Sequence, residues 1–240
     1  MNRQKSKWHT EEIAQTYLEG VRGAIPGASL QLELISKIVS TWRPLPFRIL
    51  DLGCGDGILG RMLLGENPKA HLIFADFSEP MLGKVRSRTG TDQRVEIINI
   101  DFSTSAWAKR IELERPFDVI VSGFAIHHQP DERKRGLYAE IHGLLCRGGV
   151  FLNLDQVSSA TDLIGELFDR FFLDHVRRFH TSARPSITMR EIKEAYYQDK
   201  KENIPAPVET QCGWLRDIGF RDVDCFFKTL ELALFGGRKK

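Results

Sequence analysis

Glycines spaced one apart follow an aspartate at the end of an apolar stretch. The stretch runs over Ile49–Leu52 and is interrupted by Asp51, and the glycines begin directly after it. Because glycine lacks a Cβ and readily adopts positive φ, the backbone N–H groups of Gly53 and Gly55 can approach a bound molecule closely. We therefore predict a strand followed by a nucleoside-binding loop, with Cys54 inside it.

Two classes of ligand are compatible with these glycines. Gly55, Gly57 and Gly60 also satisfy the dinucleotide fingerprint, and an acidic residue follows about 20 positions later at Asp76. A carboxylate at Asp51 would repel a pyrophosphate, whereas it would attract a sulfonium that carries an α-ammonium group. The charge of Asp51 therefore favours a cationic ligand over a dinucleotide.

Acidic residues end three successive apolar stretches. Asp51 is followed by Asp76 after residues 71–75 and by Asp101 after residues 94–100. In open α/β sheets the ligand lies outside the carboxyl ends of the strands, so we expect the three carboxylates to face one ligand. Each aspartate alone also suits a helix cap or a turn, and this alternative stays open, especially for Asp101.

The aspartate and glycine pattern resembles motif I of class I S-adenosylmethionine-dependent methyltransferases. The resemblance implies that S-adenosyl-L-methionine is the cofactor, that Asp76 binds both ribose hydroxyls and that Asp101 receives the adenine amino group. The cofactor-binding residues expected on this basis are Asp51, Gly53, Cys54, Gly55, Asp76, Phe77, Met81, Asp101, Phe102, Ser122, Gly123 and Tyr17.

The alternation of strands and helices predicts an α/β fold. We expect a Rossmann-like, doubly wound sheet of seven strands, mostly parallel, with an antiparallel C-terminal hairpin whose turn lies at Lys228–Thr229. The expected parts of this single domain, 1–240, are an N-terminal helical lid (1–45), a cofactor-binding core (46–155), a helical substrate-roof insertion after the fifth strand (156–206), and a final helix with the hairpin (207–240). Helices are expected at about 10–22, 29–42, 158–180, 188–202 and 208–218.

Within the fold the resemblance is closest to the small-molecule branch, in particular to carboxy-S-adenosylmethionine synthase and its methyltransferase relatives. It rests on the segments 25–27, 129–133, 202–204, 207–210 and 219–220. Ala28 stands where the synthase has a cofactor-contacting tyrosine. Gln198, Lys200 and Lys201 stand where its carboxylate-binding arginine lies. Ordinary methyl transfer is therefore favoured, and a synthase-like enzyme, a tRNA-modification-related enzyme and an inactive cofactor-binding protein remain alternatives.

Two adjacent histidines follow the fourth expected strand. A sulfonium is a good leaving group, so in-line SN2 transfer needs a base only if the acceptor atom carries a proton. A neutral histidine suits that task near pH 7, which makes His127 the candidate base and His128 a candidate substrate contact. A histidine there occurs in methyltransferases with dissimilar acceptors, and this favours a scaffold role for His127.

The helical insertion carries an excess of arginine. Arg177 and Arg178 are candidates for binding a carboxylate or phosphate on the substrate, because guanidinium groups pair bidentately with either. A solvated helix face is the favoured alternative. On the expected lid, Tyr17 and Arg22 are candidates for cofactor or substrate contact.

Composition also bears on the class of protein and on its partners. Thirty-four basic against 32 acidic residues give a net charge of +2, which gives no strong signal for nucleic acid. The sequence contains no apolar run of membrane-spanning length, and its four cysteines lack metal-ligand spacing. We therefore expect a cytoplasmic protein without a metal site that acts on a small molecule; an acidic acceptor and a homodimer are open alternatives.

Overall fold

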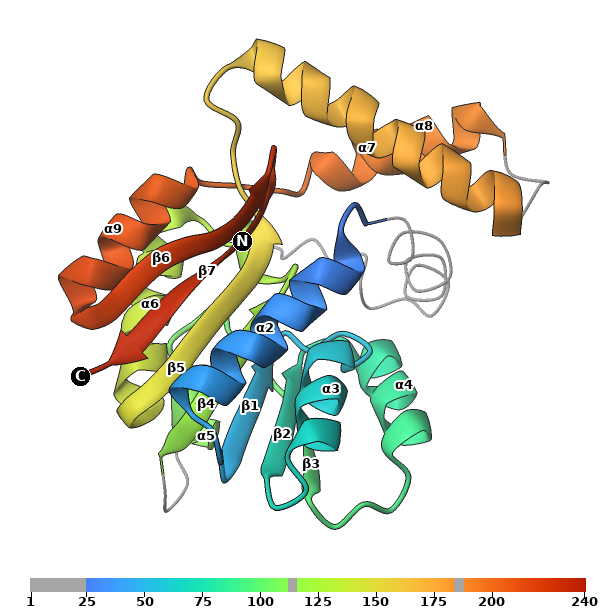
Figure 1. Cartoon of the computed structure of the whole chain (residues 1–240). Coiled ribbons are helices and arrows are strands. Elements are labelled where there is room, and N and C mark those ends of the chain that lie inside the picture. Colours follow the sequence, from blue (N-terminus) through green and yellow to red (C-terminus); the bar gives the residue numbers. More distant parts are fainter. Residues whose placement is uncertain (1–24, 112–115, 184–187) are drawn as a thin grey trace.

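A seven-stranded sheet runs through the molecule in the order β3-β2-β1-β4-β5-β7-β6 (Figure 1). The computed structural model describes residues 25–111, 116–183 and 188–240. The strands are β1 (Arg48–Leu52), β2 (His71–Asp76), β3 (Val95–Asn99), β4 (Phe117–Gly123), β5 (Leu145–Gln156), β6 (Phe220–Thr229) and β7 (Leu232–Lys239). β1 to β5 pair in parallel, and β7 runs antiparallel to both β5 and β6. The predicted fold class is confirmed.

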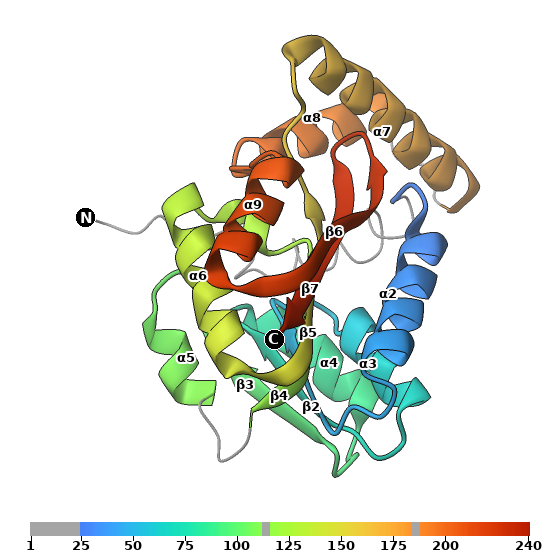
Figure 2. The ribbon, with the colours of Figure 1, turned by 60° about the vertical axis from the view of Figure 1, so that its left-hand side comes forward.

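Helices cover both faces of the sheet. The helices are α2 (Ala28–Trp42), α3 (Ile58–Glu66), α4 (Glu79–Thr89), α5 (Ala106–Ile111), α6 (Asp131–Leu144), α7 (Asp162–Ala183), α8 (Met189–Lys200) and α9 (Val208–Ile218). One face packs against α2, α3 and α4, and the other against α5, α6 and α9 (Figure 2). This three-layer arrangement leaves the carboxyl ends of the parallel strands as the edge at which a ligand can bind.

The central strands are apolar on both sides because both faces are covered. On neighbouring strands β1 and β2, Ile49 and Leu72 belong to the core under α2 and α3, whereas Leu50 and Ile73 belong to the core under α6 and α9. Successive side chains of a strand point to opposite faces, so a continuous apolar run fills two cores at once.

Helix α2 follows the turn that ends at Gly27, which has φ of 74°. Its buried residues Gln31, Ile35 and Val39 recur at every fourth position and face the sheet. The helix expected at 29–42 is thus confirmed. The helix expected at 10–22, with Tyr17, lies outside the described residues.

The helical insertion forms a hairpin of α7 and α8 that stands above the rest of the molecule (Figure 1). Phe168, Phe172 and Ile192 are buried in a small core that also includes Ile25 and Leu232, so the hairpin packs against the segment before α2 and the start of β7. Helix α7 begins at Asp162, four residues after the predicted start. The reason is that the N–H of Ser158 donates to the carbonyl of Ala206 at 3.2 Å, so this segment lies extended beside the α8–α9 connection.

The turn between β6 and β7 differs from the prediction at Lys228–Thr229. Thr229 still pairs with Leu232, so the turn residues are Leu230 and Glu231. Leu230 has φ of 53°, a conformation that leucine rarely adopts. The turn contains no glycine or asparagine, so its position could not be predicted from residue type. The carbonyl of Glu231 accepts a hydrogen bond from Val157 N–H at 2.7 Å, which fixes the turn against the end of β5.

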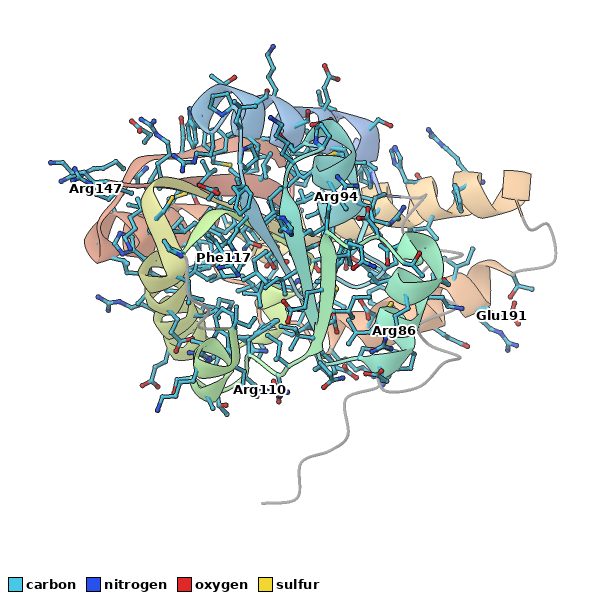
Figure 3. All side chains as sticks on the ribbon, turned by 90° about the horizontal axis from the view of Figure 1, so that it is seen from below. Arg86, Arg94, Arg110, Phe117, Arg147 and Glu191 are labelled. Atoms are coloured by element: carbon cyan, nitrogen blue, oxygen red, sulfur yellow. The ribbon has the colours of Figure 1, made fainter. Side chains whose placement is uncertain are left out.

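Charged side chains surround the packed layers. Seen from below, Arg86, Arg110 and Arg147 lie at the periphery, whereas Phe117, which is 1% exposed, lies among the strands (Figure 3). Within the described ranges, no helix combines the length and the apolar character that crossing a membrane requires.

Candidate functional site

Gly55 differs from its neighbours in the loop after β1. A Cβ at Gly53 would lie 2.4 Å from that of Ala125, and one at Gly60 would lie 2.6 Å from the Phe74 ring. A Cβ at Gly55 would meet no described atom within 4 Å, although its φ of 53° still favours glycine. The outer glycines therefore serve packing, and Gly55 borders open space.

Asp51 lies beneath the loop. It is 1% exposed, and its Oδ2 accepts a hydrogen bond from Gly60 N–H at 2.8 Å. Gly60 is in the first turn of α3, where backbone N–H groups have no partner within the helix. The carboxylate thus joins the end of β1 to the start of α3.

Asp76, at the end of β2, holds the same loop from the other side. Its Oδ2 accepts from Gly55 N–H and its Oδ1 from Ser78 N–H, both at 2.8 Å. The side chain is 6% exposed, and burial raises the pKa of Asp76 even though the backbone donors oppose that rise. The structure therefore brings Gly55 and Asp76 together from positions 21 residues apart in the chain.

The other expected cofactor residues divide by exposure. Cys54, Met81, Phe102 and Ser122 are buried, Phe77 and Gly123 are half-buried, and Asp101 is exposed. The hydroxyl of Ser122 donates to the carbonyl of Leu52 at 2.7 Å, which links β4 to β1 below the loop. Asp101 Oδ1 accepts from Ser103 N–H at 2.8 Å, so this aspartate closes the turn after β3.

Comparison with known proteins agrees with this geometry. Residues 50–151 match a family described as methyltransferase domain. The matched residues include the glycine loop, Asp76 and Asp101, so this part of the chain is similar to methyltransferase domains. A carboxy-S-adenosyl-L-methionine synthase of Chromohalobacter salexigens is 22% identical over 93% of this chain and 80% of its own. A malonyl-(acyl-carrier protein) O-methyltransferase 2 of Ilyobacter polytropus is 27% identical over 44% of this chain, and the match spans only 38% of that relative.

Solved structures agree with the fold of this chain. An O-methyltransferase family protein of Burkholderia thailandensis has a TM-score of 0.68 at 16% identity, and the match covers 99% of this chain and 63% of that one. Human N-acetylserotonin methyltransferase, solved in complex with S-adenosylmethionine, has a TM-score of 0.60 at 15% identity, and the match covers 100% of this chain and 60% of that one. The residues around Gly55 fit S-adenosylmethionine, because the loop leaves the space that a Cβ would fill and places the Asp76 carboxylate beside that space.

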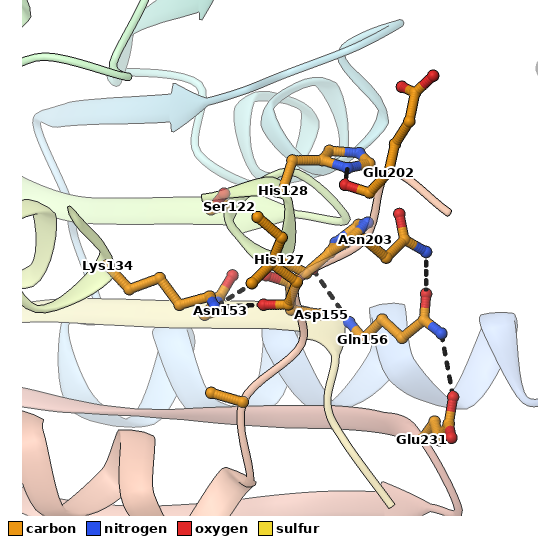
Figure 4. Close-up of polar contacts among 12 residues, drawn as sticks. Ser122, His127, His128, Lys134, Asn153, Asp155, Gln156, Glu202, Asn203 and Glu231 are labelled. Atoms are coloured by element: carbon orange, nitrogen blue, oxygen red, sulfur yellow. Dashed lines mark hydrogen bonds and ion pairs between the residues drawn. The ribbon is translucent and has the colours of Figure 1, made fainter. Parts of the chain in front are cut away.

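His127 forms a buried pair with an aspartate on the neighbouring strand β5. Its Nδ1 lies 2.5 Å from Oδ1 of Asp155, and the side chains are 6% and 2% exposed (Figure 4). Asp155 also accepts from Gln156 N–H at 3.0 Å and from the amide of Asn153 at 3.2 Å. The carboxylate is thus fixed on three sides and in turn fixes the imidazole.

A second layer of hydrogen bonds supports Asn153. Its amide donates to the Tyr138 hydroxyl at 3.4 Å, and that hydroxyl donates to Gln211 at 2.6 Å. The amide of Gln211 donates to the carbonyl of Ala206 at 3.0 Å. Burial raises the pKa of Tyr138, so this group stays a neutral donor. The network connects β5 to α6 and α9 behind the histidine.

His128 lies beside His127, with ring centroids 4.0 Å apart. Burial and the neighbouring imidazole lower the pKa of His128 to about 4. His128 is therefore neutral at pH 7 and can exchange hydrogen bonds with an uncharged group.

The segment 201–206 passes over the histidines. The N–H of Ile204 donates to the carbonyl of His127 at 2.9 Å. The ammonium of Lys134, on α6, donates to the carbonyl of Ile204 and to Oδ1 of Asp131. Since Lys134 is fully buried, its charge depends on these oxygens, and they hold the segment in place.

Sequence reasoning missed several residues around His127. Asp155 follows the fifth apolar stretch, just as Asp51, Asp76 and Asp101 end the first three. The same pattern of an aspartate after an apolar stretch therefore also predicts Asp155 as a site residue. Gln156 and Glu231 come near His127 only through tertiary contacts, and no local pattern marks them. Asn203 lies in the 202–204 segment, to which the resemblance assigned no role.

The arginines of α7 lie elsewhere. Arg177 and Arg178 are both exposed, and Arg177 Nη2 lies 3.7 Å from Oδ1 of Asp174 one turn earlier.

No group of three or more histidine, cysteine, aspartate or glutamate side chains suited to a metal ion occurs in the part of the chain that the structure describes.

Proposed function

We propose that the protein transfers a methyl group from S-adenosylmethionine to a proton-bearing atom of a small molecule, with His127 as the base. The observation that carries this proposal is the buried contact of 2.5 Å between His127 Nδ1 and Asp155 Oδ1. A carboxylate at Nδ1 keeps the proton on that nitrogen and leaves Nε2 free to accept one.

The bound cofactor supplies an electrophilic methyl group on a sulfonium. The chain supplies the rest: Gly55 and Asp76 hold the nucleoside, and His127 takes the acceptor's proton while Asp155 stabilises the resulting imidazolium. This arrangement favours a base over the scaffold role that the sequence favoured, because a scaffold histidine needs no buried carboxylate. The acceptor atom is then the oxygen of a hydroxyl or the nitrogen of an amine.

A carboxy-S-adenosylmethionine synthase activity remains the alternative, since those relatives align with most of this chain. A carboxy-S-adenosylmethionine synthase needs a cationic side chain that binds the extra carboxylate of the carboxylated cofactor. The ammonium of Lys200 donates to Asp169, and that of Lys201 is exposed and donates to Gln198. These contacts support ordinary methyl transfer.

Three further proposals concern the surroundings of the site. An acidic acceptor would require Arg177 or Arg178, whose exposure supports a solvated face instead. The cytoplasm is supported by the four cysteines, which form no disulfide. A homodimer would be recognised by sedimentation at several protein concentrations.

The test combines two measurements on the whole protein. Isothermal titration calorimetry should show binding of S-adenosylhomocysteine in the micromolar range, at about −7 to −8 kcal/mol. Mass spectrometry should then detect a methylated product when the protein is incubated with S-adenosylmethionine and a protein-free extract of small metabolites. Saturable NAD binding without any response to S-adenosylhomocysteine would contradict the cofactor assignment.

Variants of the pair test the base itself. His127→Gln and Asp155→Asn should each lower kcat by about 10²- to 10⁴-fold while cofactor affinity changes less than about twofold. His142→Gln is the matched control, because this histidine lies at the end of α6 against Phe220. Full activity of both variants of the pair would leave His127 a scaffold residue.

A further inference from the structure

Four side chains form a continuous hydrogen-bonded chain beside His127, and three of them, Asn203, Gln156 and Glu231, are labelled in Figure 4. The amide of Asn203 donates to Oε1 of Gln156 at 2.9 Å, and the amide of Gln156 donates to Oε2 of Glu231 at 3.1 Å. The other carboxylate oxygen of Glu231 accepts from the hydroxyl of Ser159 at 2.7 Å. These residues come from the 201–206 segment, the end of β5, the β6–β7 turn and the loop before α7.

The carboxylate sets the direction of this chain. An ionised glutamate only accepts hydrogen bonds, so Gln156 must turn its NH₂ group toward Glu231 and its oxygen toward Asn203. Asn203 must then turn its own NH₂ group toward Gln156, and its oxygen is the end that remains. The chain that begins at Glu231 and continues through Gln156 therefore ends in a hydrogen-bond acceptor, the side-chain oxygen of Asn203, and not in a donor.

The oxygen at that end is buried. No described residue donates to Oδ1 of Asn203, and the atom is shielded from solvent. In Figure 4 this oxygen points away from Gln156. A buried polar atom without a partner is costly, and polarisation along a hydrogen-bonded chain strengthens its terminal acceptor. This oxygen is therefore suited to a hydrogen-bond donor on a ligand.

Two members of the chain, Gln156 and Asn203, lie next to residues that contact the proposed base. Gln156 follows Asp155 and donates its N–H to the carboxylate that contacts His127. Asn203 precedes Ile204, whose N–H donates to the carbonyl of His127. A molecule that contacts Oδ1 of Asn203 is thus within reach of the region that His127 serves.

We propose that Asn203, oriented by Gln156 and Glu231, is the acceptor-binding residue of this site and selects a substrate that presents a hydroxyl or amine donor rather than a carboxylate. The inference rests on the proposed methyl transfer and adds the residue that binds the acceptor and selects it. Oδ1 of Asn203 only accepts hydrogen bonds, so it suits a hydroxyl or amine donor and offers no proton to a carboxylate.

The experiment follows the label of [methyl-³H]S-adenosylmethionine into a protein-free extract of small metabolites. The labelled product is purified and identified by mass spectrometry, and its precursor becomes the substrate for kinetics. We expect the methyl group on a hydroxyl oxygen or an amine nitrogen. Asn203→Leu and Asn203→Ser should both raise the KM for that precursor about tenfold, with the affinity for S-adenosylhomocysteine unchanged.

Asn67→Leu is the matched control. Asn67 ends α3, and its amide donates to the carbonyl of Leu63 at 2.8 Å. This variant should keep the wild-type KM, and thermal melts of all variants identify any that fail to fold. A wild-type KM in both Asn203 variants would overturn the inference and leave the proposed methyl transfer standing. A methyl ester of a carboxylate would overturn the inference and the base role of His127 together. Bound cofactor without any transferred label would instead overturn the proposed function, and the inference with it.

Discussion

At the scale of single residues, the glycines of the loop after β1 do different work. Gly60 has no room for a Cβ, because the Phe74 ring and Oδ2 of Asp51 lie 2.6 and 3.0 Å from its place. Gly55 has room but carries positive φ and donates its N–H to Asp76. One glycine therefore holds the helix against the sheet, and the other shapes the ligand side of the loop.

Alanine variants should separate these two roles. Gly60→Ala should destabilise the fold by about 1–3 kcal/mol through overpacking, as measured by urea unfolding. Gly55→Ala should cost about 1–2 kcal/mol through strain and should also weaken binding of S-adenosylhomocysteine at least about tenfold. If the two variants lost affinity for S-adenosylhomocysteine equally at the same stability, the two glycines would not have separate roles.

Asp76 should show its role through affinity and pH. Asp76→Ala should weaken binding of S-adenosylhomocysteine by about 1.5–3 kcal/mol, because a charged acceptor is removed from a buried site. Since burial raises its pKa, protonation should reduce the affinity of the wild type at a pH above the ordinary value of 3.8. Calorimetry across pH checks this, and an unchanged affinity in the variant would reduce Asp76 to a turn residue.

At the scale of elements, the α7–α8 hairpin depends on one aspartate. Asp169, on α7, accepts from the hydroxyl of Tyr196 at 2.6 Å and from the ammonium of Lys200, both on α8. Phe172 stacks near the same tyrosine, with ring centroids 5.4 Å apart. Polar and apolar contacts thus join the two helices, and the hairpin owes much of its geometry to Asp169.

Asp169→Ala should loosen this hairpin selectively. The loss of two hydrogen bonds, one of them charged, should cost about 1–3 kcal/mol of local stability. Hydrogen exchange should accelerate in α7 and α8 and stay unchanged in β1 and β4. Glu166→Ala is the matched control, since its ion pair with Arg170 is exposed and 3.9 Å long. Uniform acceleration across the sheet would show that the hairpin does not open on its own.

At the scale of the whole molecule, stability should depend on pH through His128. Its pKa is about 4 in the folded protein against 6.5 for an ordinary histidine, so the unfolded chain binds more protons between these values. Stability therefore rises with pH across this window and is lost as pH falls from 6.5 toward 4. Asp76 opposes this trend, because a raised carboxyl pKa favours the folded state at low pH.

Thermal melts between pH 4 and 6.5 test the contribution of His128. His128→Gln should flatten the decline in melting temperature that the wild type shows on acidification. His71→Gln is the control, since His71 is exposed at the start of β2. The same slope in wild type and His128→Gln would assign the acid sensitivity to other groups.

The sequence by itself determined the sheet and the glycine loop. Burial on both faces makes central parallel strands uniformly apolar, and aspartates at their carboxyl ends are local signals that need no tertiary information. The pairing of His127 with Asp155 and the chain from Glu231 to Asn203 were decided by the tertiary structure alone. Their members lie 28 to 75 residues apart, and hydrogen bonds between side chains so distant leave no periodic trace in a sequence.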